Sequence, residues 1–147
     1  MKKLLLSVLF TVMLLSACSP AKIESTSNRD KWTQANITHY RFQLTVGCFC
    51  AFTQQMPLTI EVKDGKIVSM TNNAGEAVAA DMLATFDQYD TVERLFDFVE
   101  KAQKDAAEVK VDYDSTHGFP AQVSIDYIKN AMDDELSLSV TNFEALK

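Results

Sequence analysis

One amphipathic helix, flanked on each side by three alternating segments, limits the folds open to this chain. Its apolar stripe recurs at helical spacing, at Val92, Leu95, Phe96, Val99 and Ala102. The alternating segments have the two-residue period of half-buried strands and cover residues 39–50, 58–63, 66–70, 109–113, 119–125 and 136–140. Because such strands bury only one face, we expect an antiparallel sheet that the helix covers on one side and that water wets on the other.

The order of these elements predicts a single α+β domain. A short helix over about residues 28–36 precedes the first strand, which gives the order α-βββ-α-βββ. We expect a curved antiparallel sheet of about six strands packed on one main helix. Asp90 with Glu93 has the pattern of a capping box at the start of that helix. Residues 72–88 fit either a loop or a loose helix.

The N-terminus has the layout of a bacterial export signal. Two lysines precede an apolar run over residues 4–15, which is too short for a membrane span of about 20 residues. The run ends in Leu-Ser-Ala-Cys, which resembles the bacterial lipobox, where lipid is attached to the cysteine and the signal is cut just before it. We therefore expect residues 1–17 to be a signal peptide and Cys18 to carry covalent lipid. The alternative is an ordinary signal peptide with an incidental cysteine.

The residues that follow Cys18 predict how the domain is attached. Residues 18–28 are polar and rich in serine, which is typical of a flexible tether, so the folded domain is expected over residues 29–147. Two or more acyl chains would hold the protein stably in a membrane. Ser19 stands where an aspartate would change sorting, and resemblance to sorted lipoproteins then favours the outer membrane, facing the periplasm, in a host with two membranes.

The charge balance excludes some partners. The chain has 14 basic and 20 acidic residues, a formal net charge of −6, and the loss of two signal-peptide lysines makes it about −8. An acidic domain argues against binding to nucleic acid or direct adhesion to anionic lipid. The expected partners are the membrane, through the lipid anchor, and an unidentified envelope protein or small ligand. No cofactor is expected besides the lipid on Cys18.

Cys48 and Cys50 are the most informative pair of the folded part. Residues two apart in a regular strand lie ~6.5 Å from each other, whereas a disulfide needs Cβ atoms ~3.8 Å apart. A bridge therefore requires a bend, which Gly47 can supply. Four interpretations remain open: a quiet local disulfide, a redox-active pair, a soft-metal site, or reduced buried thiols. A metal site needs further ligands, and neither His39 nor His117 has ligand spacing to the pair.

Three aspartates form a second candidate binding set. Asp112, Asp114 and Asp126 lie on the polar parity of their segments, so neighbouring antiparallel strands could place them on one wet face. Clustered carboxylates suit Ca²⁺, although no fixed calcium-loop spacing occurs. The alternative is an ordinary solvated face with acidic turns.

Evidence for catalysis in the sequence is weak. Neither a nucleophile elbow, nor a zinc-protease helix, nor a phosphate loop occurs. A Cys48/His117 nucleophile pair is conceivable across the sheet, but His117 precedes a glycine in a turn.

A group of aromatic residues could line a ligand pocket between helix and sheet or belong to the hydrophobic core: Trp32, Tyr40, Phe42, Phe96 and Phe98.

Several short motifs follow one another along the chain: Trp32, Tyr40-x-Phe42, Cys48-x-Cys50, Asp64-Gly65-Lys66, Leu95-Phe96, Tyr113-Asp114, Gly118-x-Pro120, Asp126 and Asp133-Asp134. Together they resemble a family of small bacterial lipoproteins that is catalogued as a domain of unknown function. The resemblance covers nearly all of residues 30–142. It implies the domain layout and a location in the bacterial envelope, and it implies no activity, substrate or catalytic residue.

These observations favour a non-enzymatic, lipid-anchored envelope domain with a binding or structural role. The alternative is a thiol–disulfide or copper-handling protein that uses Cys48 and Cys50.

Overall fold

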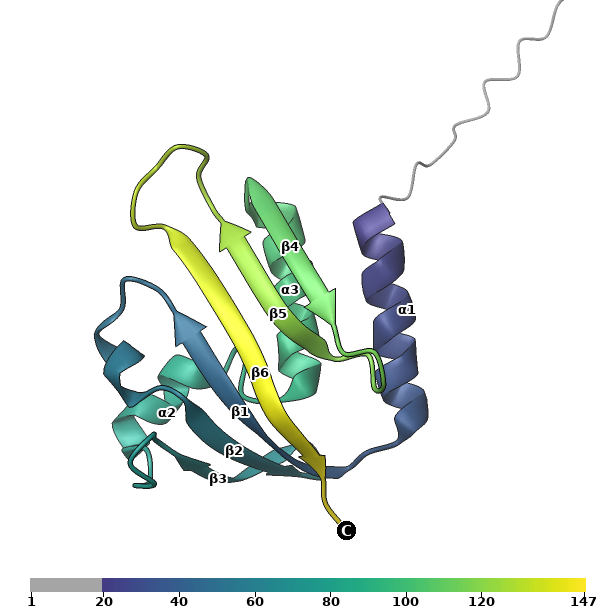
Figure 1. The fold of residues 1–147 in the computed structure, drawn as a ribbon, viewed down its shortest axis with the longest axis vertical. Coiled ribbons are helices and arrows are strands. Elements are labelled where there is room, and N and C mark those ends of the chain that lie inside the picture. The colour runs from purple at the N-terminus through teal and green to yellow at the C-terminus, as the bar shows by residue number, and fades with distance from the viewer. Residues whose placement is uncertain (1–19) are drawn as a thin grey trace, which may run out of the picture.

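The computed structural model describes residues 20–147 and confirms a single α+β domain (Figure 1). Its helices are α1 (Pro20–Ala35), α2 (Ala80–Phe86) and α3 (Val92–Asp105), with a short 3₁₀ helix η1 (Ala51–Gln55). Its strands are β1 (His39–Gly47), β2 (Leu58–Lys63), β3 (Lys66–Thr71), β4 (Glu108–Tyr113), β5 (Pro120–Asp126) and β6 (Glu135–Ala145). The predicted signal peptide and Cys18 lie outside the described residues.

All six strands form one sheet in the order β3-β2-β1-β6-β5-β4, and every neighbouring pair is antiparallel. Each half of the sheet is a three-stranded meander, and the pairing of β1 with β6 joins the two halves at the centre. The register between β1 and β6 shifts between Arg41 and Gln43, where Asn142 has a φ of 51°. Such a bulge lets β6 keep its apolar residues on the buried face beyond the shift, where Phe143 packs.

The core lies between one face of the sheet and the helices, as Figure 1 shows for α3 behind β4 and β5. The helical stripe predicted from the sequence is buried along its whole length, together with Phe98. From the sheet, Phe42, Leu44, Ile60 and other alternating residues are fully buried. The opposite sheet face carries mostly serine, threonine, glutamine and charged residues, in agreement with the expected wet side.

The first helix starts earlier than expected, which corrects the prediction of a flexible tether up to residue 28. Residues 20–28 belong to α1, and the proline at its first position fits a helix start. Among the side chains described in this helix, residues 23–35, only Ser25 and Trp32 are buried, because its sequence lacks a broad apolar stripe. It packs against the turn between β4 and β5 as well as against α3. In that turn the Ser115 carbonyl accepts a hydrogen bond from the Lys31 ammonium, and a side chain at Gly118 would collide with the Asn28 carbonyl.

The start of α3 also differs from the prediction. Thr91, not Asp90, is the capping residue, because its hydroxyl accepts a hydrogen bond from the Arg94 amide at 3.2 Å. The sequence left residues 72–88 open, and they contain both alternatives. A turn held by the Asn72 side chain, which accepts from the Ala74 and Glu76 amides, is followed by the short helix α2.

No helix within residues 20–147 is long and apolar enough to cross a membrane.

Candidate functional site

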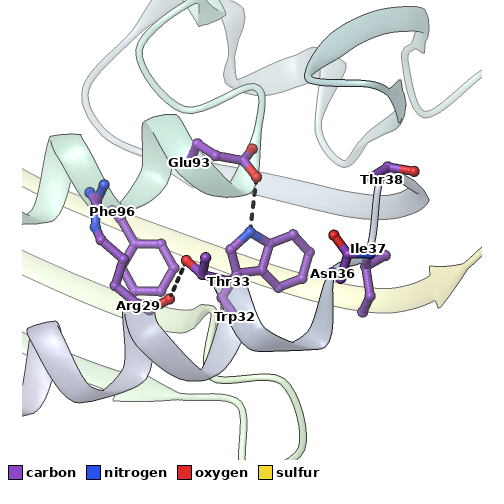
Figure 2. A pocket seen from close by; sticks show the side chains of 8 residues that line it. All are labelled: Arg29, Trp32, Thr33, Asn36, Ile37, Thr38, Glu93 and Phe96. Carbon is purple, nitrogen blue, oxygen red and sulfur yellow. Dashed lines mark hydrogen bonds between the residues drawn. The ribbon is translucent and has the colours of Figure 1, made fainter.

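A hollow of about 300 Å³ opens between α1 and the start of α3 (Figure 2). Its lining comes from the last turns of α1, the connection to β1 and the first turns of α3: Arg29, Trp32, Thr33, Asn36, Ile37, Thr38, Glu93 and Phe96. The Trp32 indole forms an apolar floor and is 4% exposed. The hollow therefore combines aromatic surface with one carboxylate and one guanidinium group, which is the mixture found in small-ligand sites.

Glu93 is the chemical centre of this hollow. One of its oxygens accepts a hydrogen bond from Trp32 Nε1 at 2.9 Å, and the other accepts from the Tyr40 hydroxyl at 3.2 Å. The Tyr40 oxygen in turn accepts from the Val92 amide at 3.1 Å. Each Glu93 oxygen keeps a further lone pair, so the carboxylate can still accept a hydrogen bond from a ligand.

The phenol of Tyr40 is held in its neutral form. Burial raises the pKa of Tyr40 well above its ordinary value, although the hydrogen bond from the Val92 amide acts in the opposite direction. The negative charge of Glu93 raises this pKa further. Tyr40 therefore acts as a hydrogen-bond bridge between β1 and the start of α3, and it is a poor general base near neutral pH.

Arg29 closes one side of the hollow. Its guanidinium carbon lies 5.0 Å from the centre of the Phe96 ring, a cation–π arrangement. Its nitrogens lie 2.7 Å from Asp97 and 3.1 Å from Glu100, both on α3. These ion pairs tie α1 to α3 at the rim and direct the charge of Arg29 away from Glu93.

The predicted aromatic group separates into two roles. Trp32 and Phe96 line the hollow, whereas Tyr40 and Phe42 stack on each other in the core with ring centres 6.0 Å apart. Phe98 packs edge to face against Tyr89. Sequence reasoning placed Trp32 and Phe96 among the pocket candidates but missed Glu93, because its position three residues after Asp90 suggested a capping role.

The three predicted aspartates do not form one site. Asp112 faces Gln122 across the β4–β5 pair, whereas Asp126 lies at the other end of that pair, opposite Glu108. Asp114 shapes the turn instead, since its Oδ1 accepts from the amides of Thr116 and His117. Among the described residues, no group of three or more histidine, cysteine, aspartate or glutamate side chains is arranged to hold a metal ion.

Cys48 and Cys50 form a disulfide, with Cα atoms 5.2 Å apart. The bend that it requires is present, because β1 ends at Gly47 and Cys50 already caps η1. Both cysteines are partly buried, but Phe49 between them is 86% exposed. The bridge thus fixes the end of β1 and presents Phe49 to the surroundings.

His117 lies far from this pair, so the conceived Cys48/His117 nucleophile does not form. Its ring centre is 5.1 Å from that of Phe143 near the end of β6, whereas Cys48 follows Gly47, which pairs with Ser137 near the start of β6. Six strand residues separate these two levels, a distance of about 20 Å. The other histidine, His39, is paired with Glu61 at 2.9 Å.

The disulfide closes a loop of only three residues, so it should contribute little to stability. The loop-entropy relation gives roughly 1.5 kcal/mol for such a loop. We expect the double variant Cys48→Ser/Cys50→Ser to fold, with a free energy of unfolding lower by about that amount. Guanidinium unfolding followed by circular dichroism measures it. A loss of the size typical of a long-range disulfide would show that the bridge has a larger structural role.

An ion pair at the start of α3 joins the buried carboxylate of Asp90 to the half-exposed Arg94 and sets a pH dependence. Asp90 is 2% exposed, and one Arg94 nitrogen donates to both of its oxygens, at 2.7 and 2.9 Å. Burial raises the pKa of Asp90 above its ordinary value, and the bond and charge of Arg94 only partly oppose this. The folded state therefore binds this proton more tightly than the unfolded state, and the contribution of Asp90 to stability increases as pH falls through its folded pKa.

An Asp90→Asn variant tests this sign. Its stability relative to the parent should fall between pH 7 and pH 4, because only the parent gains from protonation at this position. Urea unfolding of both proteins at the two pH values gives the comparison. A difference in the free energy of unfolding that is the same at both pH values, or that changes in favour of the variant at pH 4, would contradict the raised pKa of Asp90.

Comparison with known proteins places most of this structure in one family. Residues 24–145 match the model of a family of unknown function, DUF6174. The chain belongs to this family. The matched range begins inside α1 and ends at the last residue of β6, so it contains the whole sheet and all residues that line the hollow. No curated protein and no solved structure matches the chain.

Proposed function

We propose that this member of DUF6174 is a lipid-anchored lipoprotein of the bacterial envelope with a non-enzymatic binding role. The N-terminal sequence supports the anchor, since charge, apolar run, small residues and Cys18 follow in the order of a lipoprotein signal. The observation that carries the proposal is the position of α1, which begins at Pro20, two residues after Cys18. The anchor would therefore hold the folded domain directly at a membrane.

Fatty-acid labelling tests the anchor. Bacteria that express the full chain are grown with an alkyne-bearing fatty acid, and the purified protein is coupled to a fluorophore. We expect covalent label on the protein, and the Cys48→Ser/Cys50→Ser variant, which keeps Cys18, should be labelled equally. An unlabelled parent protein would remove the anchor from the account.

The hollow between α1 and α3 is the place that we assign to a small ligand. An apolar floor at Trp32 and a carboxylate at Glu93 suit a molecule with an apolar body and a cationic donor group. The polarity of the rim supports a soluble ligand rather than a core-filling lipid. The same proposal includes an outer-membrane location facing the periplasm in a host with two membranes, which the resemblance to sorted lipoproteins and Ser19 favour.

Trp32 is the only tryptophan of the chain, which makes it a direct reporter of this hollow. We expect benzylamine to change its fluorescence saturably, and neutral benzyl alcohol to have a much weaker effect. Glu93→Gln should weaken benzylamine binding about 10- to 100-fold, because a hydrogen bond to a charged group is worth ~1.5–3 kcal/mol. Asp105→Asn, at the other end of α3, serves as the matched control, because its carboxylate pairs with Lys101 and neither residue lines the hollow. Equal responses of parent and Glu93→Gln would exclude this site.

A second candidate function is a thiol–disulfide or copper-handling role for Cys48 and Cys50. The observation in favour of this role is the disulfide itself, which lies next to the exposed side chain of Phe49. A measured reduction potential below about −300 mV would mark an inert structural bond and exclude the redox role. Cu(I) titration that affects the parent and a Cys48→Ser variant alike would exclude the copper role.

A further inference from the structure

The most exposed large apolar side chains of the described residues gather at one end of the sheet. They are Phe49, Ile128 and Met132, with exposures of 86%, 63% and 87%. Phe49 lies in the turn after β1, and the other two lie in the loop between β5 and β6. Large side chains exposed in this way lose their hydration cost only when another apolar phase covers them.

Strand pairing shows that these two connections lie at the same end. The last residue of β1, Gly47, pairs with Ser137, which is two residues from the start of β6. The last residue of β5, Asp126, pairs with Glu135, the first residue of β6. In Figure 1 the β5–β6 loop projects at the upper left, and the connection after β1 projects below it on the same side. Phe49, Ile128 and Met132 are called the apolar tips below.

The N-terminal end of α1 points the same way. Three residues separate the end of the helix from the start of β1, at the opposite end of the sheet, and from there the helix runs back alongside the domain. Its 16 residues span about 24 Å, and Figure 1 shows its first turn level with the upper ends of β4 and β5. The two residues from Cys18 to Pro20 can reach at most about 7 Å.

We propose that this end of the domain rests on the membrane and that the apolar tips insert into the interfacial layer of a zwitterionic bilayer. The inference rests on the proposed lipid anchor, which would bring the start of α1 within about 7 Å of the membrane surface. The lipid class follows from charge: Asp133, Asp134 and Glu135 lie beside Met132, so an anionic surface would repel the loop. Insertion of several side chains beside a covalent anchor would fix the orientation of the domain.

The orientation also determines where the hollow lies relative to the membrane. The hollow lies at the last turns of α1, toward the end of the domain that carries the C-terminus in Figure 1. A domain that rests on its apolar tips would thus keep Glu93 and Trp32 facing away from the bilayer, open to soluble ligands.

Lipid-quenching fluorescence tests the proposal on the mature protein, purified from bacterial membranes with its own anchor. Two variants each add one tryptophan to the constant background of buried Trp32: Met132→Trp at a tip, and Val68→Trp on β3 as a control. Val68 is 57% exposed but lies near the hairpin at the opposite end of the sheet. Both proteins are placed in phosphatidylcholine vesicles with and without bromine on the acyl chains, and vesicle flotation is recorded in parallel.

We expect both variants to float with the vesicles, and we expect brominated lipid to reduce the emission of Met132→Trp but not that of Val68→Trp. Flotation with the same degree of quenching in both variants, including none in either, would overturn the membrane contact of the tips while leaving the anchor intact. If addition of a soluble envelope extract abolishes the quenching of Met132→Trp, a protein rather than lipid covers the tips, and this result would also overturn the proposal. Failure to float would contradict the anchor and this inference together.

Discussion

Replacing Cys18 with serine is expected to abolish lipid attachment completely and to leave residues 1–17 on the chain. The cysteine thiol is the only group in the proposed lipobox to which lipid can be joined, and cleavage depends on that modification in the lipoproteins that the sequence resembles. The measurement is labelling with an alkyne-bearing fatty acid combined with gel mobility. The variant should be unlabelled and should migrate as the longer precursor.

A second chain separates anchoring from export. When residues 1–18 are replaced by the signal peptide of a soluble periplasmic protein, the domain should leave the membrane fraction and partition into the aqueous phase of a detergent extract. The apolar tips alone bury too little surface for stable attachment, which needs two or more acyl chains or an equivalent. A domain that stays with the membrane without Cys18 would show that another part of the chain is sufficient.

Trp32→Ala should cause the largest loss of stability of any single substitution in α1, about 3–5 kcal/mol. The indole is 4% exposed, and it meets the rings of Tyr40, Phe143 and Phe119 edge-on, with centres 5.3, 5.8 and 6.2 Å away. Truncation leaves a cavity there and removes the donor to Glu93. Guanidinium unfolding followed by circular dichroism gives the free-energy difference.

Two further substitutions act as controls, one at the next residue and one at Trp32 itself. Thr33→Ala changes the next residue, which is exposed, and should alter the free energy of unfolding by less than about 0.5 kcal/mol. Trp32→Phe keeps most of the ring contacts and should fall between the two. If Trp32→Ala were as mild as Thr33→Ala, then α1 would not be an integral part of the folded domain.

The sheet could be predicted from sequence because its strands alternate strictly. Tyr40, Phe42, Leu44 and Val46 share one parity, and the structure buries all four. The main helix was equally clear, because one stripe from Val92 to Ala102 supplies all of its buried residues except Phe98. In both cases the periodicity of the buried residues is a local property, so it can be read without knowing the tertiary structure.

The start of the domain could not be predicted because α1 depends on contacts with residues about 90 positions away. Its buried strip consists of Ser25 and Trp32, and its side meets the turn that ends at Gly118. A helix with so little apolar surface resembles a polar tether in its sequence. The separation of the aspartates escaped prediction for a related reason, since Asp112 and Asp126 share a parity but the β4–β5 register sets them at opposite ends of the strand pair.

Only some of the residues that line the hollow could be predicted from the sequence. Aromatic spacing indicated Trp32 and Phe96, but the partner of the indole, Glu93, comes from a helix 61 residues later in the chain. The position of Glu93 after Asp90 also fitted a capping box, and Thr91 takes that role instead. A long-range hydrogen bond between an indole and a carboxylate leaves no local pattern, so only the fold reveals it.

Intact-mass analysis of the mature protein, purified from membranes with and without reductant, tests the central claim most directly. The account predicts a chain that starts at Cys18, carries the mass of a diacylglycerol unit and a third acyl chain, and gains two hydrogens at Cys48 and Cys50 on reduction. A mature chain that begins at Cys18 or elsewhere with no added lipid mass would contradict it.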